Sequence, residues 1–419
     1  MRQPVSVGWR GPRVYLIRLW PLMISLEEAQ TAILGAIKRA RDTEVVPLEE
    51  ALTRYLAEPL QARVDHPGFD NSMMDGYALA VADARAHDFA LPVVGASTCG
   101  DAPKALTPGT AMRIYTGAPL PGGADAVVIQ EDVEIVGDRV RLPASIAAGD
   151  NIRRRGEDYR KGEALYAPGR RLNPLDLALL GSAGIDRLAV YRRARALVAS
   201  TGDELVPPGR ALAPGQIYES NRLAISAQLR ALGADVVDGG IVADDVNALR
   251  AVLARSGEYD FVVTSGGASV GDHDVVKQAF SEIGTIRLWK VRIKPGKPIA
   301  FGHIGERTHF FVLPGNPVSS LVTYKFFVEP AVTVWHHAEP RLWQLSAVAE
   351  SAFRRRPGRT EFLRARLRSD RGRLLAEPLS GQGSHMVGAL RHTNGFIRVE
   401  AESEGFGAGD PVTVIPLEF

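Results

Sequence analysis

The chain has 419 residues, of which 45% are hydrophobic and 23% are charged, as in an ordinary globular protein of about three domains. Its formal net charge of +2 predicts no general affinity for nucleic acids or membrane surfaces. The single cysteine, Cys99, excludes a disulfide framework and any zinc or iron–sulfur site built from cysteines, and it favours a reducing cytoplasm.

The first 22 residues differ in character from the remainder of the chain. Their apolar run is interrupted by Arg18 and Pro21, so they make a poor secretory signal. Met23 then opens a segment in which Ser25 and two glutamates are typical of a helix start. We therefore expect the natural start to be Met23 and residues 1–22 to be a non-native or disordered extension.

From Met23 onwards the sequence changes pattern several times. Two helical patterns, EEAQTAILGAIKRA and PLEEALTRYLAEPL, fill most of residues 24–60. Short apolar segments between Gly and Pro turns predict a β-rich unit over 61–160, and a helical pattern returns within 161–190. Strand and helix patterns alternate over 191–340, which predicts an α/β domain with a mostly parallel sheet. Residues 341–419 predict a small antiparallel sheet or barrel.

Three predicted strands of the α/β domain end in loops of glycine and polar residues. Because the carboxyl ends of parallel strands share one edge of a sheet, these loops are expected to converge there. Asp244, which comes after GGIVA, is expected at the same edge. The loops carry Thr201, Asp203 and Glu204, then Ser265, Gly266, Gly267 and Ser269, and finally Pro314, Gly315 and Asn316.

The second of these loops, TSGGASVGDHD, ends on Asp272 and Asp274. Glycine-rich loops hold phosphate through backbone N–H groups, yet carboxylates repel phosphate. A hard cation such as Mg²⁺ between them reconciles the two. Positive charge for the phosphate is offered by Lys290, Lys294 and Lys297, three of the eight lysines of the chain. The pattern predicts a phosphorylated or nucleotide ligand with a divalent metal.

Each motif also has a plainer interpretation. TGDE is typical of a helix cap, SGGASVG of a tight turn, and KPGKP of a solvated hairpin tip. Their expected convergence favours function over these alternatives. Neither GxGxxG nor GxxxxGK[ST] occurs, so the common dinucleotide and P-loop interpretations have no support. The β-rich unit has a polar cluster of its own in PGFDNSMMDGYALA, where an Asx-type turn is the alternative.

The order of the motifs resembles that of the molybdopterin molybdotransferase family, the MoeA and gephyrin E-domain family. The resemblance is carried by FDNSMMDGYA, RIYTGAP, NIRRRGEDYRKGE, STGDEL, GQIYESN, TSGGASVGDHD, IKPGKPIAFG, LPGNPVSS and GQGSH. It covers the chain from Met23 to the C-terminus. Met73 and Ala268 stand where the family pattern has Ala and Val, and neither change removes a charged or polar group.

The resemblance implies a multidomain fold. An elongated helical and β domain is formed by 24–60 plus 161–190, an inserted β-rich domain by 61–160, an α/β molybdopterin-binding domain by 191–340, and a C-terminal β-barrel by 341–419. It also implies a homodimer in which the inserted domain of one subunit faces the α/β domain of the other.

The implied reaction inserts molybdenum from molybdate into adenylated molybdopterin, with Mg²⁺-dependent release of AMP. The alternatives are a molybdopterin adenylyltransferase and a non-catalytic scaffold or pterin-binding protein. Implied partners are the adenylyltransferase and the maturation proteins of molybdoenzymes, without nucleic acid or membrane.

The resemblance also suggests roles for single residues. It implies that Asp244, Asp272 and Asp274 bind the metal. The residues expected to take part in catalysis are Asp274, Asp244, Glu204, Lys290 and Lys294. The ligand is expected to contact the loop residues named above and, from the other subunit, Asp75 and Thr116. Molybdate is expected at Lys297, Ser319, Arg359 and Ser384.

Overall fold

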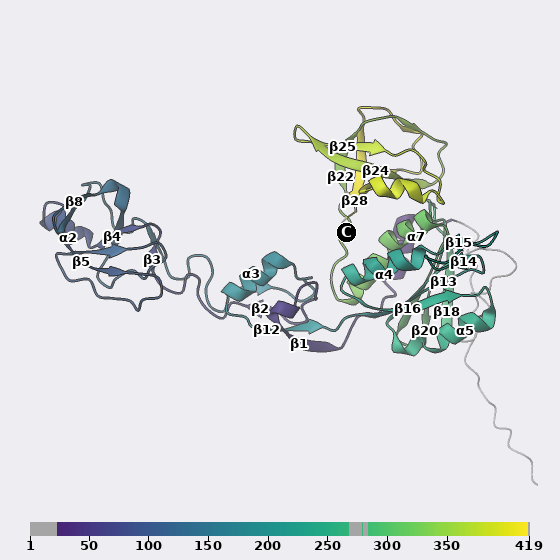
Figure 1. Cartoon of the computed structure of the whole chain (residues 1–419), viewed down its shortest axis with the longest axis horizontal. Helices are drawn as coiled ribbons and strands as arrows, with labels where there is room; N and C mark the ends of the chain where they lie inside the picture. Colours follow the sequence, from purple (N-terminus) through teal and green to yellow (C-terminus); the bar gives the residue numbers. More distant parts are fainter. Residues whose placement is uncertain (1–22, 268–278, 280–283, 418–419) are drawn as a thin grey trace, which may run out of the picture. The chain divides into compact units, whose positions relative to one another are not determined.

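The computed structural model describes residues 23–267, 279 and 284–417. The chain divides into two compact units, coloured by sequence in Figure 1. The first unit comprises Met1–Thr43, Thr53–Tyr55 and Tyr191–Phe419, and the second comprises Glu44–Leu52 and Leu56–Val190. Predicted residues Ser269, Asp272 and Asp274 lie outside the described residues.

The α/β part of the first unit is built on a six-stranded sheet in the order β16-β13-β17-β21-β20-β18. The first four strands run parallel; at one side β20 pairs antiparallel with β21, and β18 pairs antiparallel with β20. Every residue of β17 and β21 is buried, as parallel strands between two helical layers require. The predicted α/β domain with a mostly parallel sheet is therefore confirmed. The strands are β16 (Asp235–Val242), β13 (Arg195–Thr201), β17 (Phe261–Ser265), β21 (Thr308–Leu313), β20 (Pro298–Ile304) and β18 (Gly284–Lys290).

Helices cover both faces of this sheet. On one face lie α1 (Leu26–Leu34), α4 (Asn221–Ala231), α7 (Pro317–Thr323), the π-helix η4 (Tyr324–Val328) and α8 (Glu329–Trp335), and Figure 1 shows α4 beside α7. On the other face α5 (Val246–Ala254) packs Leu249 and Leu253 against the strands. Burial of each leucine contributes about 1.5–3 kcal/mol to the free energy of folding. No helix in the described ranges is long and apolar enough to cross a membrane.

The two helices predicted within 24–60 have different outcomes. The first is confirmed: Ser25 caps α1 with its side chain, and Glu28 bonds back to the Ser25 backbone in a capping box. The second is wrong, because its segment holds only the short 3₁₀ turn η1 (Leu48–Glu50) after strand β1 (Thr43–Pro47). Thr53 takes a φ of 64°, and this left-handed conformation ends any helix there.

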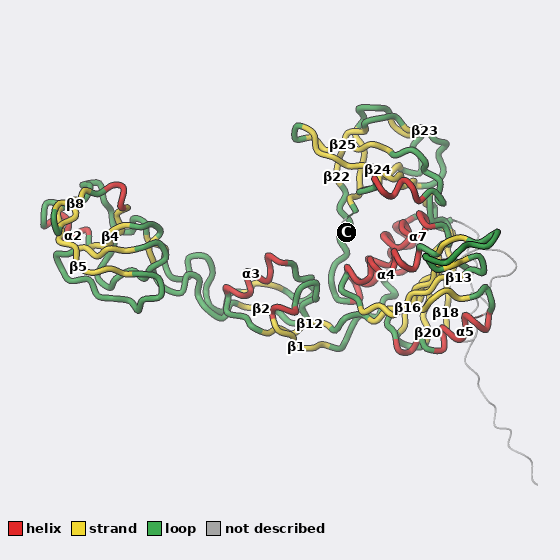
Figure 2. Tube along the Cα trace, viewed as in Figure 1, coloured by secondary structure: helices red, strands yellow, loops and turns green. Residues whose placement is uncertain are grey.

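The second unit contains two small assemblies of secondary structure. In one, strand β12 (Arg187–Tyr191) pairs with β1, and β2 (Leu60–Gln61) pairs with β11 (Ala164–Tyr166) beside helix α3 (Pro174–Ser182). The other, within 61–160, is β-rich as predicted and forms a six-stranded sheet in the order β7-β4-β6-β5-β9-β8. Strand and loop dominate this unit in Figure 2. The sheet strands are β7 (Ala126–Ile129), β4 (Gly76–Leu79), β6 (Ala111–Ile114), β5 (Ala90–Ser97), β9 (Arg139–Arg141) and β8 (Glu134–Val136).

The C-terminal strands of the first unit close into a barrel. Five strands neighbour one another in the order β24-β25-β22-β28-β26, and β26 pairs back with β24. Leu363, Ile397 and Val414 fill the interior. A short strand, β19 (Ile293–Lys294), ends at the first lysine of the KPGKP segment. It pairs with β24 and so joins the barrel to the α/β part. The strands are β24 (Thr360–Asp370), β25 (Arg373–Pro378), β22 (Leu345–Ala349), β28 (Pro411–Pro416) and β26 (Gly395–Val399).

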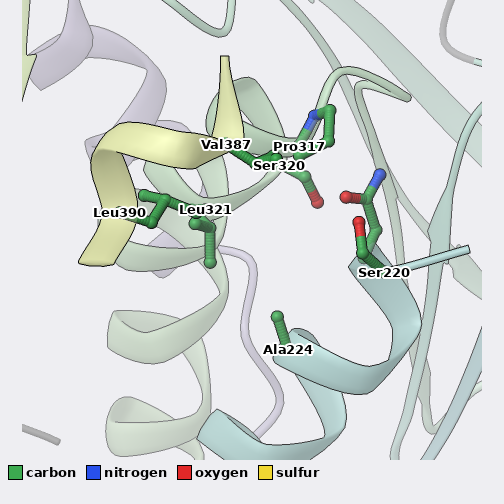
Figure 3. A pocket seen from close by; sticks show the side chains of 8 residues that line it. Ser220, Ala224, Pro317, Ser320, Leu321, Val387 and Leu390 are labelled. Carbon is green, nitrogen blue, oxygen red and sulfur yellow. The ribbon is translucent and has the colours of Figure 1, made fainter. Parts of the chain in front are cut away.

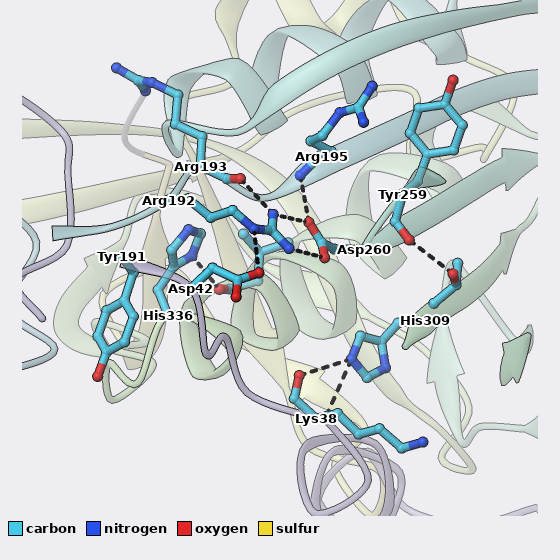
Figure 4. A network of polar contacts seen from close by, with 12 residues as sticks. Lys38, Asp42, Tyr191, Arg192, Arg193, Arg195, Tyr259, Asp260, His309 and His336 are labelled. Atoms are coloured by element: carbon cyan, nitrogen blue, oxygen red, sulfur yellow. Dashed lines mark hydrogen bonds and ion pairs between the residues drawn. The ribbon is translucent and has the colours of Figure 1, made fainter. Parts of the chain in front are cut away.

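A buried polar network ties the segment after α1 to the amino-terminal end of the parallel strands (Figure 4). Asp260, just before β17, accepts from Arg192 Nη1 at 2.6 Å, from Arg192 Nη2 at 2.8 Å and from Arg195 N at 2.9 Å. His309 of β21 contacts the backbone of Lys38 through Nε2. The amino-terminal end of the parallel strands is thus occupied by structural contacts.

Candidate functional site

The carboxyl ends of the four parallel strands meet at one edge. In the strand register Thr201 lies beside Val242, Ser200 beside Ser265, and Ser265 beside Leu313. The segments directly after these strand ends, 202–204, 243–244, 266–267 and 314–316, therefore start side by side, as the alternation of strands and helices predicts. We call this row of loops the strand-end edge.

Two of its loops touch through glycine. Gly266 has a φ of +102°, and a Cβ there would lie 2.4 Å from the Thr201 carbonyl oxygen, so no other residue fits. A Cβ on Gly315 would lie 3.7 Å from the Gly266 Cα. Thr201 Oγ1 is buried and meets no hydrogen-bond partner in the described part of the chain. The backbones thus approach closely enough to act as one surface.

Three acids gather at the other side of the strand-end edge. Asp203 Oδ1 accepts a hydrogen bond from the Asp244 backbone N–H at 3.1 Å. A Cβ on Gly202 would lie 2.6 Å from Glu204 Oε2, so this carboxylate lies against the Gly202 backbone. Partial burial, followed by the charges of Asp203 and Glu204, raises the pKa of Asp244. A cation would relieve this repulsion.

Carboxylate oxygens are the ligands that Mg²⁺ prefers, so the chemistry of Asp203, Glu204 and Asp244 fits that ion. Across residues 23–267, 279 and 284–417, however, no three acidic, histidine or cysteine side chains are grouped closely enough to hold a metal. Asp272 and Asp274, the remaining predicted metal ligands, fall outside these ranges.

The three predicted lysines lie on a fixed connection rather than at a solvated hairpin tip. A Cβ on Gly296 would lie 2.8 Å from Thr323 Cγ2, so the KPGKP segment packs on α7. Lys294 Nζ forms an ion pair with Glu361 Oε1 of the barrel at 2.8 Å, which offsets its charge. Lys290 and Lys297 are exposed, and no carboxylate within the described ranges pairs with them.

The residues predicted for molybdate lie where the barrel meets the α/β part. Ser319 of α7 is buried, and the neighbouring Val318 N–H donates to the Ser384 carbonyl at 3.1 Å. The GQGSH loop therefore contacts the start of α7. Arg359 Nη1 donates to the Ile293 carbonyl at 3.4 Å, beside β19.

A buried arginine in the barrel, Arg364, was missed by the sequence analysis. Its side chain is 0% exposed, and Nη2 and Nη1 donate to the carbonyls of Gly383 at 3.1 Å and Met386 at 3.3 Å. No described carboxylate pairs with it, and burial lowers its pKa. The GQGSH loop thus folds over an uncompensated positive charge. In EFLRARL nothing distinguishes this arginine from the many others, and only its burial identifies it.

Asp75 and Thr116 form a separate cluster in the second unit. Asp75 Oδ1 accepts from the Thr116 backbone N–H at 2.7 Å and from its Oγ1 at 2.9 Å. These hydrogen bonds, the backbone one first, lower the pKa of the half-buried Asp75. The Cys99 thiol donates to the Thr116 carbonyl at 3.1 Å. This half-buried carboxylate is thereby held ionised in a fixed orientation.

A small apolar pocket borders the strand-end edge (Figure 3). Its volume is about 150 Å³, which is below the roughly 300–1,000 Å³ of a typical small-molecule site. The pocket is therefore too small to enclose a ligand of that size. The pocket is lined by Ser220, Asn221, Ala224, Pro317, Ser320, Leu321 and, from the 3₁₀ helix η5 (Val387–His392), Val387 and Leu390.

Comparison with known protein families assigns each part of this fold. Residues 24–184 match the MoeA N-terminal region (domain I and II), residues 197–334 match a probable molybdopterin binding domain, and residues 346–417 match the MoeA C-terminal region (domain IV). The strand-end edge thus lies within the domain type that is described as binding molybdopterin.

Relatives of known name extend over nearly the whole chain. The molybdopterin molybdenumtransferase of Haemophilus influenzae is 37% identical over 403 residues, covering 94% of this chain and 99% of that protein. The molybdopterin molybdenumtransferase of Bacillus subtilis is 33% identical over 388 residues, covering 89% and 90%. The crystal structure of the molybdopterin biosynthesis MoeA protein from Pyrococcus horikoshii is similar, with a TM-score of 0.79, 28% identity and coverage of 94% and 100%.

The fold and the matches define a multidomain protein built from MoeA-type regions around a molybdopterin-binding α/β domain. The chain belongs to the molybdopterin molybdenumtransferase family.

Proposed function

We propose that this chain is a transferase that inserts molybdenum from molybdate into adenylated molybdopterin and releases AMP. The observation that carries the proposal is the strand-end edge itself. Its glycine loops offer a close backbone approach for phosphate. Its acids, and also the lysines of 290–297, lie within the domain type matched to molybdopterin binding. The two relatives from Haemophilus influenzae and Bacillus subtilis are both named molybdopterin molybdenumtransferase.

The acids of the edge suit a divalent cation. Asp244 would hold Mg²⁺ together with Asp272 and Asp274, and Asp203 and Glu204 would line the same pocket. When bound, the cation would neutralise negative charge on the phosphoanhydride of the substrate. The raised pKa of Asp244 supports this role, because carboxylates that repel one another gain from a shared positive ion.

The exposed lysines would bind the phosphates. Lys290 and Lys297 can stabilise the charge that develops as the phosphoanhydride is hydrolysed and AMP departs. Lys294 would join them only if a ligand draws it from Glu361. The loops at Thr201, Ser265, Gly266, Gly267, Pro314, Gly315 and Asn316 would hold the nucleotide and pterin along the edge.

Molybdate is a small oxyanion, and the junction of barrel and α7 offers suitable groups. Lys297, Ser319, Ser384 and Arg359 remain the proposed contacts, and the charge of Arg364 beneath the GQGSH loop favours an anion there. The dithiolene of the pterin would supply the sulfur ligands. A chain with a single cysteine can therefore handle molybdenum.

The second polar cluster suggests a role for a partner subunit. We propose a homodimer in which Asp75 and Thr116 of one subunit complete the site of the other, within a four-domain division as predicted. The exposed Cys99 is consistent with a reducing cytoplasm.

Release of AMP from adenylated molybdopterin tests the function. We expect release that requires Mg²⁺ and molybdate together. An adenylyltransferase would instead consume ATP and form the adenylated pterin, and a scaffold would bind it without turnover. Either of those results would contradict the proposal.

A further inference from the structure

Two loops of the strand-end edge are joined by one side chain that has no role in the sequence-based prediction. Asn221 is the first residue of α4. Its Nδ2 donates to Ser265 Oγ and to the Gly315 carbonyl oxygen, both at 2.7 Å. Ser265 ends β17, and Gly315 lies in the loop after β21. One amide group therefore holds the ends of two neighbouring strands.

The chemistry of both partners fixes the orientation of this amide. An amide NH₂ has two hydrogens, one for each acceptor, and the Gly315 carbonyl can only accept. Ser265 Oγ then donates its own hydrogen to the Pro314 carbonyl at 3.3 Å. A short chain of hydrogen bonds runs from α4 through β17 into the loop after β21.

The start of α4 is itself held by a buried carboxylate. Glu219 is 2% exposed, and its Oε1 accepts from Ser200 Oγ at 2.8 Å and from the Arg222 backbone N–H at 2.6 Å. Ser200 belongs to β13, the strand beside β17. Asn221 therefore projects from a base that is fixed to the sheet, as a residue that orients others must.

We propose that Asn221 is a positioning residue that locks the loops at 266–267 and 314–316 into one ligand-binding surface. The inference rests on the proposed function, because these loops are the ones proposed to bind the adenylated pterin. Asn221 acts through Ser265 and Gly315 rather than by touching the ligand. Without it the two loops would move independently, and the ligand would have to order both.

Binding of AMP to the full-length protein with Mg²⁺ tests the proposal. Asn221→Ala removes two hydrogen bonds and should weaken AMP binding about 10- to 30-fold. Asn221→Asp has the same shape but no hydrogens to donate and adds a negative charge, so it should weaken binding at least as much. Ser220→Ala is the control, because this neighbouring side chain makes no capping hydrogen bond, and its affinity should stay within about twofold of the wild type.

A double substitution distinguishes positioning from an independent contribution. If Asn221 acts through Ser265, the loss of AMP binding in the pair Asn221→Ala and Ser265→Ala should be smaller than the product of the two single losses. Losses that multiply would overturn the proposal, as would Asn221→Asp binding like the wild type. Melting temperatures of all variants check that the comparison is made on folded protein.

Hydrogen exchange of the ligand-free protein separates this proposal from the proposed function. Asn221→Ala should speed amide exchange at both 266–267 and 315–316, whereas Ser220→Ala should not. Unchanged exchange at either loop would refute the role of Asn221. If the wild type fails to bind AMP, the proposed function is in doubt, while the exchange result still decides the role of Asn221.

Discussion

At the scale of single residues, the strand-end edge carries acids that are unfavourable to one another without a ligand. Burial and the charges of Asp203 and Glu204 raise the pKa of Asp244, so its ionised form costs the folded state free energy at neutral pH. Natural sequences keep such groups where function needs them. The arrangement therefore predicts opposite effects on stability and on activity.

Asp244→Asn should show both effects. The neutral amide removes the repulsion, so the ligand-free protein should melt slightly higher than the wild type. Turnover should fall by about 100-fold or more, because the proposed cation loses a ligand. Thermal melting and AMP release measure the two. A variant with normal turnover would exclude Asp244 from the metal site. Asp245→Ser is the matched control, since this adjacent acid caps α5 and serine can replace it there.

At the scale of elements, Gly266 makes the contact between the loop after β17 and the end of β13 possible. In Gly266→Ala the new Cβ would lie 2.4 Å from the Thr201 carbonyl, and φ would stay at +102°. We expect a loss of about 1–3 kcal/mol in the free energy of unfolding, measured with urea and tryptophan fluorescence. All five tryptophans lie outside residues 44–190, so the signal reports the first unit.

Gly257→Ala provides the comparison for that experiment. Gly257 lies in the 3₁₀ turn η3 (Ser256–Glu258), and a Cβ there would meet no atom within 4 Å. Its effect should stay within about 0.5 kcal/mol. Equal losses in the two variants would mean that close packing at the strand-end edge is not the cause.

The individual helices and strands also show which parts of the fold could be predicted from the sequence. Parallel strands could be placed because apolar runs ended in glycine loops, and Ser25 with the two glutamates after it predicted the start of α1. The prediction of a helix after Pro47 was wrong, because the apolar spacing there is helical but Thr53 takes a left-handed conformation. Asn221 lies in the quoted GQIYESN motif, but no role could be given to Asn221 or Arg364, because their importance depends on bonds to residues outside their own motifs.

At the scale of the whole molecule, buried histidines should make the first unit sensitive to acid. Burial is the main cause that lowers the pKa values of His309 and His336 to about 4. Because the unfolded histidines have pKa values near 6.5, the unfolded state binds more protons between pH 6.5 and 4. Stability is fully present above about pH 6.5 and is lost as the pH falls towards 4.

The loss should reach up to about 3 kcal/mol for each histidine. Urea midpoints measured by tryptophan fluorescence from pH 7 to 4.5 determine it. His336 stacks on Tyr55 with ring centroids 4.2 Å apart, so His336→Phe keeps a ring in place and should flatten the pH dependence. An unchanged slope in that variant would show that His336 is not responsible.

Mixing two inactive variants tests whether the site is shared between subunits. Asp75→Asn and Asp244→Asn lie in different units of the chain. In the proposed homodimer, mixed dimers would contain one site with both substitutions and one with neither. Unfolding, mixing and refolding should therefore restore about a quarter of the wild-type activity, given random pairing and equal amounts. No recovery from variants that are each dimeric would contradict a shared site.

The most direct test of molybdenum insertion coupled to AMP release uses one reaction with Mg²⁺, adenylated molybdopterin and molybdate. The amount of AMP released is compared with the amount of molybdenum retained on the pterin. The proposed transferase should give equal amounts of the two and no AMP when molybdate is omitted. Release of AMP without molybdate, or molybdenum on the pterin without AMP, would contradict it.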